Sequence, residues 1–237
     1  MKGQTIIWLE TARRGDVAEV GGKNASLGEM IAALATSGID VPPGFATSAT
    51  AYRAFVAANG LEAPITRHLE DLAADRSTLT EAAGAIRQAI VAAPWPADLA
   101  RAITDAYHDL CGRVGQPNAA VAVRSSATAE DLADASFAGQ QETFLNVAGP
   151  EALLDAVRRC FASLFTDRAI AYREAKGFDH LAVALSVGVQ LMVRTDIGGS
   201  GVMFTLDPDT GFDRVVVINA AWGLGETVVQ GAVDPDE

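Results

Sequence analysis

The chain has 237 residues, of which 49% are hydrophobic, 20% charged and 6% aromatic. This composition is typical of a globular protein and excludes the disordered, collagen-like and disulfide-rich classes. Acidic residues outnumber basic ones by 30 to 18, and the resulting formal net charge of −12 argues against a nucleic-acid partner.

Targeting and membrane signals are missing from the sequence. No apolar stretch approaches the roughly 18 to 20 residues that a membrane-spanning helix needs. The first residues carry charge on both sides of a very short apolar patch, which is not the pattern of a signal peptide. Cys111 and Cys160 stand in helix-like segments without a partner motif and are expected to be reduced. These features predict a cytoplasmic protein with no membrane partner.

The N-terminal segment is predicted to contain a short strand and then a helix. Residues 5–9 are mostly apolar and suit a strand. The triplet Gly21-Gly22-Lys23 interrupts the chain before a helix over 25–35, where the apolar residues recur on one face. Asn24 or Ser26 would cap this helix.

Helices are also expected over most of the next seventy residues. Residues 38–45 come first and are expected to be extended, because two prolines restrict the backbone there. From 48 to 114 the apolar spacing follows a period of about 3.6, which predicts helices. Breaks are expected at 59–60, at Pro64 and at 94–96.

The second half of the sequence is richer in strands. Residues 115–118 form the best candidate for a domain boundary, followed by a strand over 119–123 and a polar loop over 125–141. A helical region is expected over 151–175. The whole pattern predicts an α+β protein with two lobes, residues 1–115 and 116–237. Further strands are predicted over 143–147, 183–193, 201–206 and 215–219.

The glycines at 21 and 22 suit an anion-binding site. Glycines before a helix let the backbone approach an anion, and the helix N-terminus offers unpaired N–H groups, so Lys23 could reach a phosphate there. The motif is not a complete P-loop, because the spacing and the Ser or Thr after the lysine are missing. The alternative is a tight turn before an amphipathic helix, with Lys23 in solvent.

Arg124 is the second candidate for phosphate binding. It ends a buried-looking strand and is followed by the hydroxyls of Ser125 and Ser126, which suits a forked contact to phosphate oxygens. The alternative is a structural ion pair of Arg124 with Glu130 or Asp131.

Two further segments could belong to a ligand site, but their patterns are less specific than those at Lys23 and Arg124. Residues 135–143 lack the regular apolar spacing of a core element, and Gly139 would permit close approach to a ligand, which suits a loop over a site or an ordinary surface loop. Gln190 follows an apolar run and would either face a nucleobase edge or satisfy backbone groups.

The histidines do not indicate a metal centre. His68, His108 and His180 share no metal-ligand spacing with one another or with the cysteines. His180 follows a glycine at a predicted helix end, where a satisfied cap is the expected role. Hydrolase signatures are missing too, since no Gly-x-Ser-x-Gly elbow occurs.

Several longer motifs occur in order along the chain, at residues 21–30, 41–45, 122–131, 135–143, 162–168, 200–204, 221–226 and 228–237. Together they resemble the N-terminal ATP-binding region of the phosphoenolpyruvate synthase (pyruvate, water dikinase) family. The resemblance covers essentially the whole chain. Pyruvate phosphate dikinase is less similar, and rifampin phosphotransferase is the close alternative because it resembles the stretch 122–145 nearly as well.

The resemblance implies an ATP-grasp nucleotide site. It implies that Lys23 and Arg124 bind the ATP phosphates and act in catalysis, that Gly139 and Thr143 belong to a loop closing on them, and that Gln190 lies near the adenine. In this family ATP pyrophosphorylates a histidine on a swivelling domain, and the phosphoryl group then passes to pyruvate. Two cations do not neutralise a triphosphate, so Mg²⁺ is expected as well.

The resemblance also predicts that the chain is a fragment. The ATP-grasp unit of the family continues past the equivalent of Glu237, and its Mg²⁺-binding acids, phosphohistidine domain and pyruvate-binding barrel come later. No metal ligand is therefore assigned within this chain. Alternatives are the ATP-binding portion of a rifampin phosphotransferase and an inactive free-standing nucleotide-binding module. A homo-oligomer of the full-length chain is one option that stays open.

Overall fold

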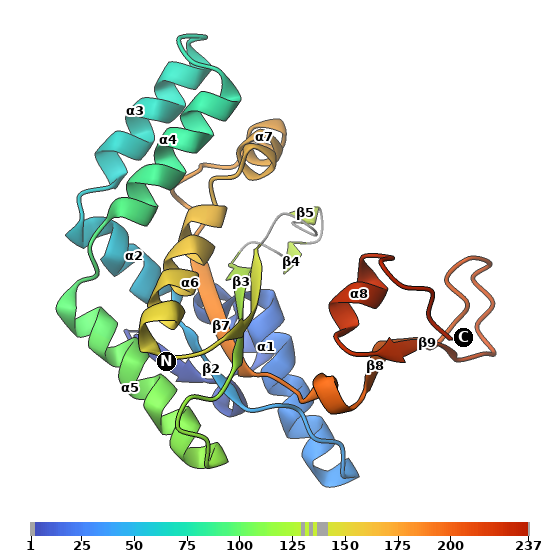
Figure 1. Ribbon diagram of the computed structural model, residues 1–237. Helices are drawn as coiled ribbons and strands as arrows, with labels where there is room; N and C mark the ends of the chain where they lie inside the picture. The colour runs from blue at the N-terminus through green and yellow to red at the C-terminus, as the bar shows by residue number, and fades with distance from the viewer. Residues whose placement is uncertain (1–2, 129–130, 133–134, 137–141, 237) are drawn as a thin grey trace. The chain divides into compact units, whose positions relative to one another are not determined.

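The computed structural model describes residues 3–128, 131–132, 135–136 and 142–236 (Figure 1). The chain divides into two compact units, Met1–Met192 and Val193–Glu237. The first contains a sheet with helices on both faces, and the second is a hairpin with one short helix. The α+β character expected from the sequence is confirmed. Within the described residues no helix combines the length and the apolar character that crossing a membrane requires.

The first unit is built around a five-stranded antiparallel sheet in the order β1-β2-β7-β3-β6. The strand order places the strand that follows residue 120 in one sheet with the two N-terminal strands. The compact units therefore divide between Met192 and Val193, while a division into lobes at residue 115 stays a prediction. The strands are β1 Ile6–Trp8, β2 Gly44–Thr47, β3 Val121–Ala127, β6 Thr143–Val147 and β7 Leu185–Leu191, and a separate small pair joins β4 Asp131–Leu132 to β5 Ala135–Ser136.

Helices cover both faces of this sheet (Figure 1). Helices α2 (Ala49–Ala58), α5 (Ala97–Val114) and α6 (Pro150–Ser163) pack on one face, and α1 (Val17–Leu34) packs on the other. The large core lies on the first face, where the alternate strand residues are apolar and buried. A much smaller core under α1 consists of Ile7, Ala12, Val20 and Ala25.

Helix α1 begins earlier than predicted and is interrupted where the break was expected. Its first turn starts at Val17, and Gly21 has φ 72° and ψ 165°, a conformation that suits glycine because it has no Cβ. The helix then continues to Leu34. The prediction that Asn24 or Ser26 caps a helix is wrong, because both residues lie inside α1.

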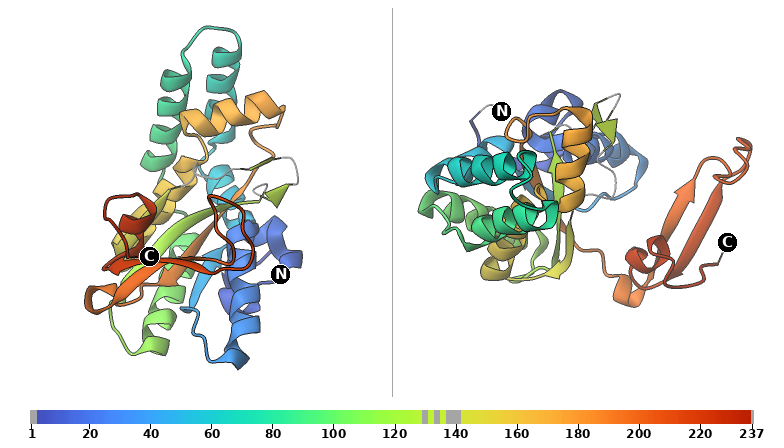
Figure 2. Two further views of the ribbon diagram at one scale, coloured as in Figure 1. Left: turned by 90° about the vertical axis from the view of Figure 1, so that its right-hand side faces the viewer. Right: turned by 90° about the horizontal axis from the view of Figure 1, so that it is seen from above.

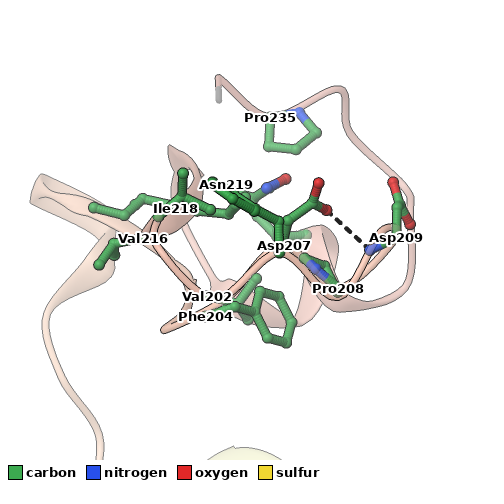
Figure 3. Close-up of a pocket in the computed structure, with 13 residues that line it drawn as sticks. Val202, Phe204, Asp207, Pro208, Asp209, Val216, Ile218, Asn219 and Pro235 are labelled. Atoms are coloured by element: carbon green, nitrogen blue, oxygen red, sulfur yellow. Dashed lines mark hydrogen bonds between the residues drawn. The ribbon is translucent and has the colours of Figure 1, made fainter.

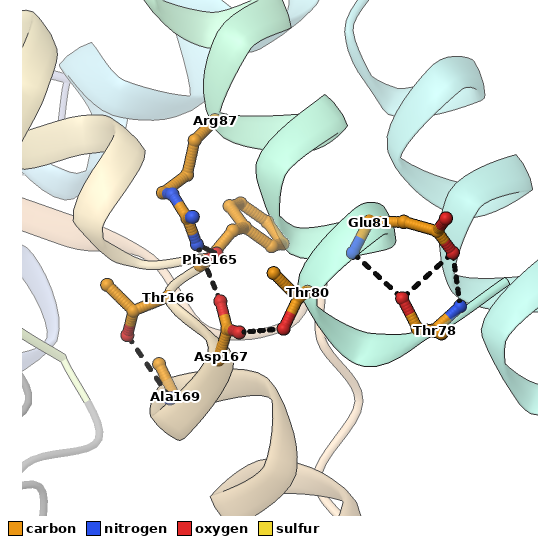
Figure 4. A network of polar contacts seen from close by, with 8 residues as sticks. All are labelled: Thr78, Thr80, Glu81, Arg87, Phe165, Thr166, Asp167 and Ala169. Carbon is orange, nitrogen blue, oxygen red and sulfur yellow. Dashed lines mark hydrogen bonds and ion pairs between the residues drawn. The ribbon is translucent and has the colours of Figure 1, made fainter.

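The predicted helical segment consists of α2, α3 (Glu62–Ala73), α4 (Leu79–Ala92) and α5, with α3 packed against α4 (Figure 2). The breaks at 59–60 and 94–96 are confirmed. The break at Pro64 is wrong, since proline is tolerated in the first turn of a helix, where its missing N–H is not needed. A further break, which the apolar spacing does not predict, lies at 74–78, where Thr78 and Glu81 form a capping box that starts α4 (Figure 4).

Helix α7 (Asp167–Lys176) is joined to α4 through its first residue. The Asp167 carboxylate accepts hydrogen bonds from the Thr80 hydroxyl at 2.8 Å and from Arg87 Nη1 at 3.1 Å (Figure 4). These bonds hold the pKa of Asp167 below its usual value. Thr166 caps the helix by accepting from the Ala169 amide.

The second unit is a two-stranded hairpin of β8 (Gly199–Phe204) and β9 (Val217–Trp222), followed by α8 (Gly225–Val229). The predicted strands at 201–206 and 215–219 overlap β8 and β9. None of the described residues of this unit is buried. Short 3₁₀ helices occur at Leu9–Thr11, Arg14–Asp16, Ala35–Ser37 and Thr195–Ile197.

Candidate functional site

Strand register places three of the predicted site residues on one face of the sheet. Directly paired residues of antiparallel strands point to the same face. Arg124 on β3 is paired with Thr143 on β6 and with Gly188 on β7. Two residues earlier, Ala122 is paired with Gln190. Since every second residue of a strand shares a face, Arg124, Thr143 and Gln190 all point to the same side.

Helix α1 brings Lys23 to this same face. The bend at Gly21 lies directly on Ser126, which is two residues beyond Arg124 on β3, and a Cβ on Gly21 would collide with the Ser126 side chain. Lys23 follows two residues after the bend and is exposed. The structure therefore brings Lys23 and Arg124, which are 101 positions apart by their numbers, to one side of the sheet.

Arg124 is the one exposed side chain of β3 and stands between buried neighbours. The predicted start of a polar loop at Ser125 is wrong, because β3 continues to Ala127 and remains paired with β7. No ion pair is found for Arg124 within the described part of the chain. Its alternative partners, Glu130 and the Asp131 side chain, lie outside the described residues, as does Gly139.

Gln190 and Thr143 lie on this face in different environments. Gln190 is only 8% exposed, and its Nε2 donates to the Pro42 carbonyl at 3.0 Å, which fixes the segment before β2 to β7. Thr143 is exposed at the first position of β6. Their roles at adenine and at the closing loop stay predictions.

The contacts that hold Lys23 in place are not among the predictions from the sequence. The next residue, Asn24, is buried, and its Nδ2 donates to the Val20 carbonyl at 2.9 Å and to the Ser186 hydroxyl at 3.0 Å. The Asn24 oxygen lies where a Cβ on Gly188 would be. A glycine and a serine inside the apolar run of β7 were the available signal, because a strand glycine often marks a close approach.

The thiol of Cys160 lies under this part of the sheet on the opposite face, with its sulfur 4.0 Å from the Val123 and Glu142 carbonyl oxygens. Burial raises the pKa of Cys160 far above its usual value, and the Glu142 charge acts in the same direction. The charges of Arg159 and Lys23 act against this rise without reversing it. Cys160 is therefore a neutral core thiol, in line with the reduced cysteine expected from the sequence.

His180 is satisfied, although not as a helix cap. Gly177 ends α7 in the left-handed conformation, while His180 Nδ1 accepts a hydrogen bond from Arg173 Nε at 3.0 Å. Burial and the neighbouring Arg173 charge lower the pKa of His180 to about 4. Arg173 itself is fully buried, and desolvation lowers its pKa to about 10. The predicted cap role of His180 is thus corrected to an acceptor for Arg173.

A cluster of metal ligands and a surface hollow are two other features that could mark a site. The described residues contain no group of three His, Cys, Asp or Glu side chains that could hold a metal ion. A hollow of about 850 Å³ lies on the second unit and is lined by Val202, Phe204, Asp207 and Asn219 among others (Figure 3). Its lining includes none of the predicted site residues that the structure describes.

The sequence is similar to one protein family and to several known enzymes along nearly its whole length. The family model described as "Pyruvate phosphate dikinase, AMP/ATP-binding domain" matches residues 17–237. Phosphoenolpyruvate synthases of Synechocystis sp. and Escherichia coli are each 55% identical over 98% of this chain, and that of Pseudomonas aeruginosa is 58% identical over 98%. The chain spans 29% of the length of each of these three relatives. Because the family model covers most of the sequence, the chain belongs to the pyruvate phosphate dikinase AMP/ATP-binding domain family.

Proposed function

We propose that the sheet face under α1 binds the phosphates of ATP through Lys23 and Arg124. The observation that supports this most is the meeting of these two exposed cations, from distant parts of the sequence, on one face of one sheet. An ammonium and a planar guanidinium complement each other at phosphate oxygens, one as a point charge and the other as a fork of donors.

The backbone around Gly21 adds to this arrangement. The helical segment of α1 that follows Gly21 starts next to β3, and the N–H groups of a helix start attract anions. Phosphoryl transfer depends on positioned positive charge more than on a covalent protein group. The same two residues are therefore proposed to act in catalysis as well as in binding.

The further roles at this face are proposed from the resemblance in sequence. Gly139 and Thr143 would belong to a loop that closes over the phosphates, and Gln190 would lie near the adenine. The fold would be the first part of an ATP-grasp domain. The described residues contain no group of three His, Cys, Asp or Glu side chains that could hold a metal ion. The acids that would hold the Mg²⁺ expected with ATP are proposed, from the same resemblance, to lie in the family's continuation past the equivalent of Glu237.

For the full-length protein we propose phosphoenolpyruvate synthase activity. ATP, pyruvate and water would give phosphoenolpyruvate, AMP and phosphate by way of a phosphohistidine on a separate domain. The support is the name shared by the three relatives reported above, which favours pyruvate over rifampin as the acceptor. This chain would supply the nucleotide-binding part of that reaction.

Nucleotide binding by the chain tests the proposed site. Lys23→Ala and Arg124→Ala should each raise the Kd for ATP roughly 10- to 100-fold in calorimetry, because each removes a charge-assisted contact. The matched controls are Lys176→Ala and Arg101→Ala, which remove exposed charges elsewhere on the first unit and should leave the Kd unchanged. Unchanged ATP binding in both site variants would refute the assignment.

The proposed reaction needs the full-length enzyme. There, Lys23→Ala or Arg124→Ala should lower kcat/KM for ATP by at least about 100-fold, as the loss of transition-state charge stabilisation does. AMP formation that requires pyruvate supports the synthase proposal, whereas AMP formation that requires rifampin instead would replace it.

A further inference from the structure

We propose that Asn24 is a positioning residue, which sets the place of Lys23 relative to Arg124 by bonding α1 to β7. This inference rests on the proposed role of Lys23 in ATP binding. It concerns a side chain that is itself buried, 2% exposed, and so does not compete with Lys23 for the ligand.

The bonds of Asn24 cross the interruption in α1. Its Nδ2 donates to the Val20 carbonyl, which lies in the short turn before Gly21, at 2.9 Å. The break at Gly21 disturbs the regular backbone ladder at this point. The Asn24 side chain therefore joins the helical turn before the break to the segment that carries Lys23.

The same amide bonds α1 to the sheet beside Arg124. Asn24 Nδ2 also donates to the Ser186 hydroxyl of β7 at 3.0 Å, and Ser186 is paired with Ser126. The Asn24 oxygen fills the space above Gly188, and Gly188 is the residue paired with Arg124. A larger residue at 188 would push Asn24 away.

Lys23 is thus held between two contacts with neighbouring strands. On one side, Gly21 lies on Ser126 of β3, and on the other, Asn24 lies on Ser186 and Gly188 of β7. Both contacts are within two residues of Arg124 or of its paired residue. Moving the backbone of Lys23 relative to Arg124 requires breaking at least one of them, so the backbone positions from which the two side chains extend are fixed before a ligand arrives.

A double-mutant cycle separates positioning from general stability. The Kd for ATP is measured by calorimetry for the wild type, Asn24→Ala, Lys23→Ala and the double variant, with AMP as a reference ligand that lacks the two outer phosphates. Asn24→Ala should weaken ATP binding by about tenfold and AMP binding by less than about threefold. In the Lys23→Ala background, Asn24→Ala should change ATP binding by less than about twofold, because its effect acts through the lysine.

The chain offers a matched control for the lost amide. Asn59 bonds in the same way, with Nδ2 donating to the Phe55 carbonyl four residues back at 2.9 Å and to the Pro94 carbonyl at 3.1 Å. Asn59 is less buried than Asn24, so Asn59→Ala should lower the melting temperature by a smaller amount than Asn24→Ala while leaving both Kd values unchanged. A loss of ATP affinity in Asn59→Ala would show that general destabilisation explains the effect and would overturn the proposal.

Ser186→Ala provides a test that keeps Asn24 in place. It removes one acceptor of the Asn24 amide and should weaken ATP binding by about threefold in the wild-type background but not in Lys23→Ala. If Asn24→Ala does not fold, Ser186→Ala alone tests the inference. Equal losses from Asn24→Ala or Ser186→Ala in both backgrounds would overturn the inference and leave the Lys23 site intact. Wild-type ATP binding by Lys23→Ala would instead remove the proposed role of Lys23 and this inference with it.

Discussion

The two compact units of the chain differ in how far they bury their large apolar side chains. In the first unit, large side chains such as Phe55, Phe161 and Ile103 are fully buried in one continuous core. In the second unit, Ile197, Met203 and Trp222 are 76%, 66% and 84% exposed. In both units the strands are paired, so that their backbone N–H and C=O groups form hydrogen bonds to a neighbouring strand, and backbone hydrogen bonding does not distinguish the units.

The difference shows where the stability of the described chain comes from. An isolated two-stranded hairpin is marginally stable in water, because it buries too little apolar area to offset its conformational entropy. The second unit is therefore expected to open at a low free energy, and the first only near global unfolding. The cations of the proposed ATP site belong to the unit that has its own core.

The largest expected effect comes from the aromatic cluster of the first unit. The ring centroid of Phe161 on α6 lies 5.2 Å from that of Tyr52 and 5.5 Å from that of Phe55, both on α2, and 5.9 Å from that of Trp95. Phe161→Ala should lower the free energy of unfolding of the first unit by about 3–5 kcal/mol, because it removes apolar contacts and leaves a cavity. Urea unfolding followed by far-UV circular dichroism measures this loss.

The matched control lies in the second unit. Phe212 is 52% exposed, so Phe212→Ala should change the free energy of unfolding by no more than about 0.5 kcal/mol. Similar losses in the two variants would remove the contrast between the units.

A smaller loss in the free energy of unfolding, which depends on pH, is expected from His180, just after the end of α7. The pKa of His180 is lowered from 6.5 to about 4 by burial and by Arg173, so between these values the unfolded chain binds a proton that the folded chain excludes. Stability from this group is complete above pH 6.5 and is lost as pH falls towards 4. Because the side chain is only half buried, a loss of about 1 kcal/mol is expected, less than the full pKa shift would give.

Urea unfolding between pH 7 and pH 4 detects this contribution. His180→Asn replaces Nδ1 by an amide that does not titrate in this range and should flatten the pH dependence. The control His108→Asn, at an exposed position of α5, should keep the wild-type slope. An unchanged slope in His180→Asn would assign the acid sensitivity to other groups.

Much of the first unit could be predicted because its elements follow simple periodicities. The helices of the 48–114 segment and the strand at 143–147 are confirmed, since their apolar spacing decides their structure locally. The predicted break at Pro64 is wrong because a proline is acceptable in the first turn of a helix. The break at 74–78 depends on the capping box of Thr78, which competes with a continuous apolar pattern.

The candidate site could be predicted only one residue at a time. The residue types at Lys23 and Arg124 suggest phosphate chemistry, but their common face depends on the pairing of β3 with β7 and on the bend at Gly21. Strand order is a long-range property that local spacing does not encode. The prediction that Asn24 caps a helix is wrong for the same reason, because its partner Ser186 is 162 residues away in the sequence.

The smallest expected effect is at Trp222, the most exposed of the tryptophans. Trp8 and Trp95 are partly buried against the core of the first unit, whereas Trp222 is 84% exposed on β9. Trp222→Phe should change the free energy of unfolding by less than about 0.5 kcal/mol, since an exposed side chain contributes little to folding. The same variant should remove most of the tryptophan emission that acrylamide quenches. If quenching in the wild type is already weak, or if the variant loses more than about 2 kcal/mol, the face of the hairpin that carries Trp222 is covered in solution, and the contrast between the units would have to be withdrawn.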